Sequence, residues 1–124
     1  MSRCILVVED QLDNRLILRD CLGNAGYELL EAENGVEALT MVARQRPDLI
    51  LMDIQLPIMD GYEATRRLKA DPATKSIPII VVTSYALSGD EAKTREAGCD
   101  GYVAKPFSPR QLLAKVREFL PDAA

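Results

Sequence analysis

Short apolar runs alternate with longer mixed segments along the whole chain. Each run is rich in branched side chains and is bounded by charged or turn-forming residues. Runs of this kind are typical of strands buried inside a sheet. The expected strands cover residues 4–8, 27–32, 49–53, 77–82 and 99–104.

The segments between these runs have the periodicity and the caps of helices. In three of them apolar residues recur at the spacing of one helix face. The expected buried faces are Leu18, Cys21, Leu22 and Ala25 in the first helix, Val36, Leu39 and Ala43 in the second, and Leu112, Leu113, Val116 and Leu120 in the last. Four helix starts resemble capping boxes. The pairs are Asn34 with Glu37, Asp60 with Glu63, Ser88 with Glu91, and Ser108 with Gln111.

The fourth expected helix differs from the others. Residues 88–98 read SGDEAKTREAG, with Ala92 and Ala97 as the apolar anchors before Gly98 ends the helix. A helix with so few apolar contacts has low local stability. We therefore expect this helix to be mobile.

Five strands alternating with five helices predict a doubly wound α/β fold, with a five-stranded parallel sheet and helices on both faces. A chain of 124 residues is long enough to bury a core without disulfide or metal support. We find no repeat, linker or low-complexity tract, and we expect one domain over residues 1–124. The Met1 start and the short end after the last helix favour a complete chain.

Composition narrows the classes of partner. A net charge of −4 and a pI near 4.8 argue against binding to nucleic acid, because phosphates repel an acidic surface. Three widely spaced cysteines and the absence of histidine argue against a zinc site and favour a reducing, cytoplasmic compartment. No long apolar run or signal sequence is present, so we expect no membrane association. A protein or a small cationic species is the expected partner.

Polar residues that carry chemistry follow four of the five expected strands. Glu9 and Asp10 follow the first, Asp53 the third, Thr83 the fourth and Lys105 the fifth. Ligands of such sheets bind outside the carboxyl ends of the strands. Because parallel strands end at one edge, we expect the five side chains to meet there, and scattered surface residues would have no reason to follow this rule.

Three carboxylates held close together repel one another unless a cation intervenes. Oxygen ligands that are few in number, with room for water and a phosphate, favour Mg²⁺. A metal would also neutralise charge on a phosphoryl group arriving at one carboxylate, while Lys105 and the Thr83 hydroxyl hold its other oxygens. Asp53, on the central strand, is the expected acceptor, and Glu9 and Asp10 are left to hold the metal.

These residues lie in motifs that resemble the response-regulator receiver domain of two-component signalling, stand-alone type, over nearly the whole chain. The motifs are Glu9-Asp10, Asp53-Ile54-Gln55-Leu56-Pro57-Ile58-Met59-Asp60-Gly61, Thr83-Ser84, and Tyr102-Val103-Ala104-Lys105-Pro106-Phe107. The resemblance implies a flavodoxin-like strand order 2-1-3-4-5. It also implies a cis peptide bond between Lys105 and Pro106.

The resemblance further implies that Asp53 takes a phosphoryl group from a phosphohistidine on a sensor histidine kinase or a histidine phosphotransfer protein. Mg²⁺ would be held by Asp10, Asp53 and the backbone carbonyl of Gln55, with Glu9 assisting, often through water. The domain would catalyse its own phosphorylation and dephosphorylation without turning over a separate substrate. A downstream protein effector would read the signal.

Thr83 and Tyr102 resemble the switch pair of this family. A hydroxyl drawn toward a phosphoryl group leaves a space that an aromatic ring can fill. The output surface would then be the fourth helix, the fifth strand and the fifth helix. Gln55 and Tyr85 occupy positions that tune loss of the phosphoryl group, and Ser84 occupies one where the family tolerates only small residues.

Two other classes compete with a receiver. A Mg²⁺-dependent phosphohydrolase with an aspartyl-phosphate intermediate would want an acid two residues after its nucleophile, where this chain has Gln55. A flavin-binding electron carrier of similar fold would want a phosphate-binding loop after the first strand, where this chain has Glu9 and Asp10.

Overall fold

The computed structural model describes residues 3–83 and 90–121, and within them five strands form one parallel sheet. The strands are β1 (Cys4–Val8), β2 (Glu28–Ala32), β3 (Leu49–Asp53), β4 (Ile79–Thr83) and β5 (Gly101–Ala104). The helices are α1 (Leu12–Asn24), α2 (Gly35–Arg44), α3 (Gly61–Ala70), α4 (Asp90–Ala97) and α5 (Pro109–Phe119). The sheet order β2-β1-β3-β4-β5 confirms the predicted flavodoxin-like fold.

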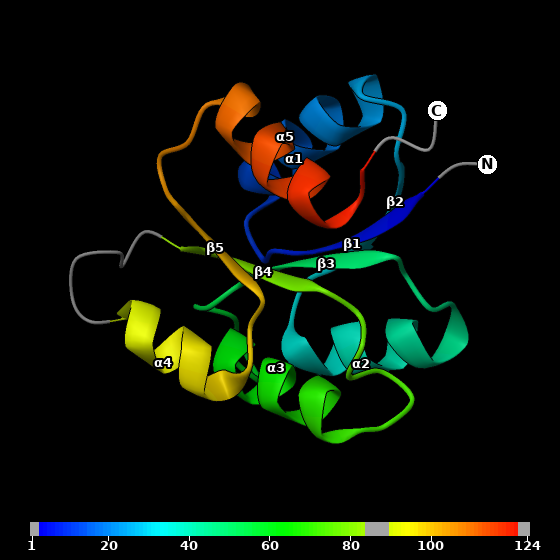
Figure 1. Ribbon diagram of the computed structural model, residues 1–124, viewed down its shortest axis with the longest axis vertical. Helices are drawn as coiled ribbons and strands as arrows, with labels where there is room; N and C mark the ends of the chain where they lie inside the picture. Colours follow the sequence, from blue (N-terminus) through cyan, green and yellow to red (C-terminus); the bar gives the residue numbers. More distant parts are fainter. Residues whose placement is uncertain (1–2, 84–89, 122–124) are drawn as a thin grey trace.

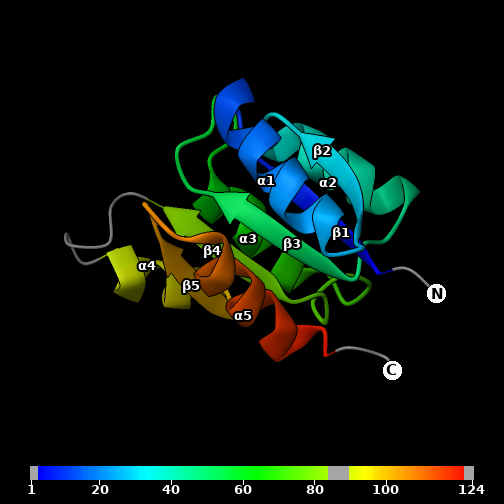
Figure 2. The ribbon, with the colours of Figure 1, turned by 90° about the horizontal axis from the view of Figure 1, so that it is seen from above.

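Helices cover both faces of the sheet. In Figures 1 and 2, α1 and α5 lie on one face and α2, α3 and α4 on the other. Alternate residues of β1 point to opposite faces, so Ile5 and Val7 join one apolar layer while Leu6 and Val8 join the other. A strand buried on both faces must be apolar throughout, which explains the unbroken apolar runs in the sequence.

Three strands begin later than the sequence pattern predicts. The Tyr27 amide donates to the Leu22 carbonyl at 3.2 Å and so closes α1. The Cys99 amide likewise closes α4 by donating to the Thr94 carbonyl at 3.1 Å, and the Ile77 amide donates within a turn. Because these amides donate within turns and helix ends, the hydrogen bonds between neighbouring strands start after them. β2 is also less buried than predicted, because it is an edge strand.

The predicted inner face of α2 is wrong at Val36 and Ala43 and right at Leu39. Val36 is 44% exposed and Ala43 is exposed, whereas Gly35, Ala38 and Val42 are buried. Ala38 and Val42 join the apolar layer and Gly35 lies against Met59, so this side of the helix faces inward and Val36, one position along, faces solvent. Leu39 packs at the margin of the apolar layer.

Two further anchors are corrected. Ala92 of α4 is exposed, and the helix is instead buried at Thr94 and Ala97. Ala25 is exposed because α1 has already ended at Asn24. The predicted mobility of α4 stays a prediction.

Helix caps follow the sequence closely. The side chains of Asn34, Asp60 and Ser108 accept hydrogen bonds from the backbone amides three residues later. In α5 the Ser108 amide also donates to Gln111 Oε1 at 2.8 Å, which completes a capping box. The predicted cap at Ser88 lies outside the described residues.

A clasp made by Lys69 and Asp100 joins α3 to the connection between α4 and β5. Lys69 Nζ donates to Asp100 Oδ2 at 2.7 Å and to the carbonyls of Lys75 and Ile77. The same Asp100 oxygen accepts from the Ile79 amide at 2.8 Å. The clasp therefore fixes the end of α4 that lies at the amino-terminal edge of the sheet.

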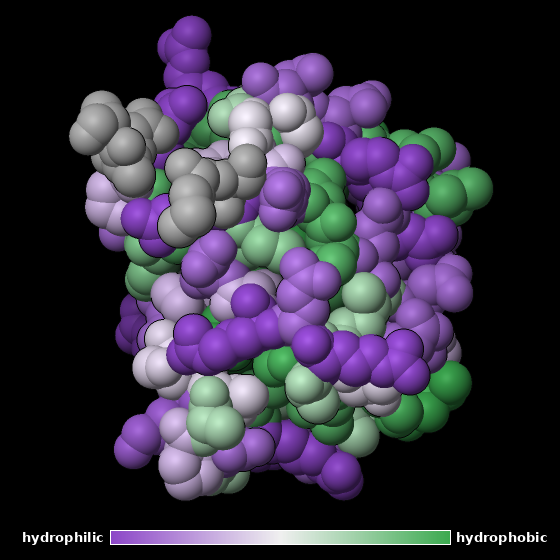
Figure 3. Space-filling model, turned by 90° about the vertical axis from the view of Figure 1, so that its right-hand side faces the viewer, coloured by the Kyte–Doolittle hydropathy of each residue, from purple (hydrophilic) through white to green (hydrophobic). Residues whose placement is uncertain are grey.

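The face around the two chain ends is mainly hydrophilic. Figure 3 shows hydrophobic residues there as patches between hydrophilic ones. Over the described ranges, we find no helix with the length and apolar character needed to cross a membrane.

Candidate phosphoacceptor and metal site

The ends of β1 and β3 bring three carboxylates together. Carboxylate oxygens of Glu9, Asp10 and Asp53 all lie within 4.8 Å of one another. Glu9 follows β1 and is 1% exposed, while Asp10 and Asp53 are partly buried. The cluster predicted from the sequence is therefore present, at the edge where the strands end.

Lys105 bridges two of these carboxylates. Its Nζ lies 2.9 Å from Glu9 Oε1 and 3.1 Å from Asp53 Oδ2. Burial lowers the pKa of Lys105, but the hydrogen bond to Glu9 and the charges of Asp53 and Glu9 outweigh it, so the pKa is raised overall. The ammonium group thus stays charged and offsets part of the repulsion among the acids.

Backbone amides orient two of the carboxylates. The Gln55 amide donates to Asp53 Oδ1 at 3.3 Å, and the Gln11 amide donates to Glu9 Oε2 at 3.1 Å. Each oxygen of Asp53 therefore has a different donor, because Lys105 contacts Oδ2. Gln55 itself is exposed.

Asp10 lacks the close ammonium partner that Glu9 and Asp53 share in Lys105. Burial, a hydrogen bond with Glu9 and the charge of Glu9 raise the pKa of Asp10. An acid with a raised pKa holds its proton to a higher pH than an ordinary aspartate. A cation beside the ionised Asp10 would offset its repulsion with Glu9.

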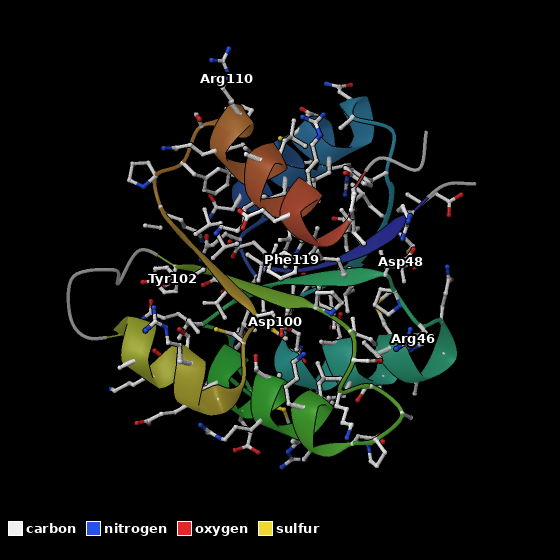
Figure 4. The ribbon with its side chains drawn as sticks, in the orientation of Figure 1. Arg46, Asp48, Asp100, Tyr102, Arg110 and Phe119 are labelled. Carbon is white, nitrogen blue, oxygen red and sulfur yellow. The ribbon has the colours of Figure 1, made fainter. Side chains whose placement is uncertain are left out.

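The predicted switch residues occupy the neighbouring strands. Thr83 is buried at the end of β4, and its carbonyl accepts from the Lys105 amide at 2.8 Å. Tyr102 of β5 is partly buried and pairs with Val81. Figure 4 shows Tyr102 on the side of the molecule where β4 ends, away from Asp48. Ser84 and Tyr85 lie outside the described residues.

The cis peptide bond between Lys105 and Pro106 is present, as predicted. Next to it a cleft of about 310 Å³ opens beside Glu9 and Lys105. Its apolar wall includes Ile17 of α1, which is 55% exposed, and Phe107.

Sequence reasoning missed two residues that shape the site. Arg15 Nη1 donates to the Glu9 carbonyl at 3.1 Å. A Cβ atom on Gly61 would collide with the carbonyl oxygen of Asp53 itself. The Asp60-Gly61 pair signalled a turn, but the sequence carried no signal of how near that turn comes to Asp53.

Carboxylate oxygens are among the ligand atoms that Mg²⁺ prefers. The three carboxylates therefore fit a hard divalent cation. No histidine occurs in the chain, and Cys4, Cys21 and Cys99 are not part of the cluster.

The metal site should respond to pH because of Asp10. A Mg²⁺ ion held by this cluster would bind the ionised form of Asp10, so its affinity is expected to fall as the pH drops through the raised pKa of Asp10. Calorimetric titrations from neutral pH downward check this, with Asp13→Asn on α1 as the control that removes an acid outside the cluster. A constant affinity down to the range of an ordinary aspartate would contradict it.

Comparison with known proteins gives a consistent result. Residues 5–117 match the model of the response regulator receiver domain. The chain is 42% identical to the polar-differentiation response regulator DivK of Brucella anthropi, over 99% of this chain and 100% of that protein.

Solved structures agree. The receiver domain of sensor histidine kinase PA1611 from Pseudomonas aeruginosa, with a magnesium ion in its active site cleft, is 36% identical with a TM-score of 0.92 and covers 98% of this chain and 100% of that one. A putative response regulator from Chloroflexus aurantiacus is 34% identical with a TM-score of 0.94, over the same shares.

Proposed function

Because this chain belongs to the response regulator receiver domain family, we propose that it is a phosphoacceptor in a two-component pathway, with Asp53 as the accepting residue. One observation carries the proposal: Glu9, Asp10 and Asp53 form a carboxylate cluster that Lys105 bridges. The receiver domain is proposed to extend over residues 1–124.

Asp10, Asp53 and the Gln55 backbone carbonyl are the proposed ligands of Mg²⁺, with Glu9 assisting. The oxygen-only donor set supports this choice. When bound, the ion would neutralise charge on the phosphoryl oxygens and on the acids.

The reaction is proposed as an in-line transfer. An Asp53 carboxylate oxygen forms a bond to phosphorus while the bond between phosphorus and the histidine nitrogen breaks, and the imidazole leaves with the electron pair. Lys105 Nζ, which already contacts Asp53 Oδ2, moves its hydrogen bond to a phosphoryl oxygen. The Thr83 hydroxyl binds another. The chain would promote its own phosphorylation and dephosphorylation in this way.

Thr83 and Tyr102 are the proposed switch pair. Thr83 is the last residue of β4, and Tyr102 lies on the neighbouring β5, which connects α4 to α5. The proposed output surface is α4, β5 and α5. Gln55, Ser84 and Tyr85 are proposed to tune the lifetime of the phosphoryl group.

The proposed phosphodonor is a sensor histidine kinase or a histidine phosphotransfer protein. Exposed apolar side chains on α1 support contact with a protein near the site, and these are Leu12, Leu16 and Ile17. A downstream protein effector is the proposed reader, in a cytoplasmic compartment that suits free cysteines. The net charge of −4 disfavours nucleic acid.

The alternative phosphohydrolase is not favoured. Gln55 holds the position where such an enzyme would want an acid, and the matching proteins above are response regulators and receiver domains.

Acetyl phosphate and intact mass measurement test the proposal. With Mg²⁺ the chain is expected to gain one phosphoryl group, and with a chelator it is expected to gain none. If the chain stays unmodified at saturating Mg²⁺, or is modified equally without it, the proposed function is wrong.

A further inference from the structure

The loop between β3 and α3, residues 54–60, is held in an unusual conformation. The Met59 amide donates to the Pro57 carbonyl at 2.7 Å, which closes a three-residue turn around Ile58. Ile58 has a φ of 69°, in a region that β-branched residues rarely adopt. Its side chain is 83% exposed, so packing of that side chain does not hold the turn. The restraint must come from neighbouring contacts.

The first turn of α2 supplies such a contact. The Gly35 amide, which has no partner within its own helix, donates to the Met59 carbonyl at 3.0 Å. A Cβ atom on Gly35 would lie 2.6 Å from that carbonyl oxygen and 2.8 Å from Met59 Cγ. The absence of a side chain at Gly35 therefore allows the loop to press against α2. Asn34, which is buried, fixes the start of the helix by accepting from the Glu37 amide at 2.9 Å.

The other end of the loop returns to the phosphoacceptor. The Gly61 amide donates to the Ile54 carbonyl at 2.9 Å, and a Cβ on Gly61 would collide with the Asp53 carbonyl oxygen. The loop thus begins and ends against the same stretch of backbone. Met59 is therefore linked to the backbone around Asp53 both along the loop and through the bond between Gly61 and Ile54.

We infer that Gly35 is a positioning residue for the phosphoacceptor site. Through Met59 it holds the loop so that the Gln55 carbonyl and the Asp53 carboxylate keep the geometry that binds Mg²⁺. Gly35 touches neither the metal nor the phosphoryl group and acts through the loop. This inference rests on the proposed function of Asp53.

The Gly35→Ala variant tests the inference, with Gly23→Ala as the matched control. Gly23 lies in α1, and a Cβ there meets no atom within 4 Å. Gly35→Ala is expected to lower Mg²⁺ affinity about 10-fold or more, as loss of a group that orients metal ligands does. It should also speed amide exchange in residues 54–60 of the metal-free protein. Gly23→Ala should leave both measurements at their wild-type values.

Urea unfolding separates positioning from a general loss of stability. A folded Gly35→Ala chain with wild-type Mg²⁺ affinity and wild-type loop exchange would overturn the inference. Should that variant fail to unfold cooperatively, Asn34→Ala loosens the same helix start without adding atoms. It is expected to weaken Mg²⁺ binding, and wild-type binding in it would overturn the inference as well.

The two proposals fail in different ways. If wild-type chain binds Mg²⁺ and is phosphorylated while Gly35→Ala behaves identically, the role of Gly35 is wrong and the function stands. If the wild-type chain binds no Mg²⁺ and takes no phosphoryl group, the function itself is wrong.

Discussion

Replacing Asp53 with asparagine is expected to abolish phosphorylation of the chain by acetyl phosphate. Asparagine keeps the shape of the side chain and its oxygen can still accept from the Gln55 amide, but it has no carboxylate to attack phosphorus. Intact mass should therefore show no gain of a phosphoryl group at any Mg²⁺ concentration. The loss is expected to be complete because Asp53 is the one carboxylate on β3.

The control for this experiment is Asp48→Asn. Asp48 Oδ2 also accepts from a backbone amide, that of Cys4 at 2.8 Å, but it precedes β3 and lies at the opposite end of the sheet (Figure 4). The control should be phosphorylated like the wild-type chain, and urea unfolding should show both variants to be folded. Phosphorylation of Asp53→Asn at the wild-type rate would show that another residue accepts the phosphoryl group.

Replacing Lys105 with methionine is expected to slow phosphorylation while preserving Mg²⁺ binding. Loss of one donor to a developing oxyanion lowers rates by about 10²- to 10³-fold. The ammonium group also neutralises Glu9 and Asp53, so its removal leaves a more negative cluster whose affinity for Mg²⁺ should be equal or higher. Calorimetry for the metal and timed mass spectra for the transfer separate the two effects.

The same variant should lose stability when no metal is present. Glu9 is almost fully buried, and removing its partner would cost on the order of 1 to 3 kcal/mol. Added Mg²⁺ should restore part of this loss. Lys115→Met on α5, where the lysine pairs with Glu118 at 3.3 Å, is the control and should change little. If Lys105→Met lost its Mg²⁺ binding, the lysine would be part of the metal site rather than a phosphoryl-binding group.

The sheet and the site were predictable because strand ends in a parallel sheet share an edge. The apolar run before Asp53 and the one before Glu9 identified β3 and β1, and the fold then brought the acids together. The rule that the more hydrophobic residue is buried failed for α2, where Ala38 is buried and Val36 is exposed. It failed again in α4, where Thr94 is buried and Ala92 is not.

Contacts between distant loops were not predictable in the same way. Lys105 was expected to bind phosphoryl oxygens, but its bridge between Glu9 and Asp53 depends on the exact path of the chain after β5. The approach of Gly35 to Met59 likewise joins residues of separate connections. No local pattern reports such an approach, because a glycine in sequence indicates freedom of the backbone and not which neighbour uses it.

The clasp between Lys69 and Asp100 sets the way in which α4 can move. Two hydrogen bonds of the Asp100 carboxylate tie the segment after Ala97 to Lys69 of α3 and to Ile79 of β4, at the edge of the sheet far from Asp53. With that end tethered, we expect a rearrangement of α4 to be a rotation about Asp100 that displaces the Asp90 end more than the Ala97 end. The end of α4 that is expected to move most is therefore the one that follows β4 and Thr83 in the chain.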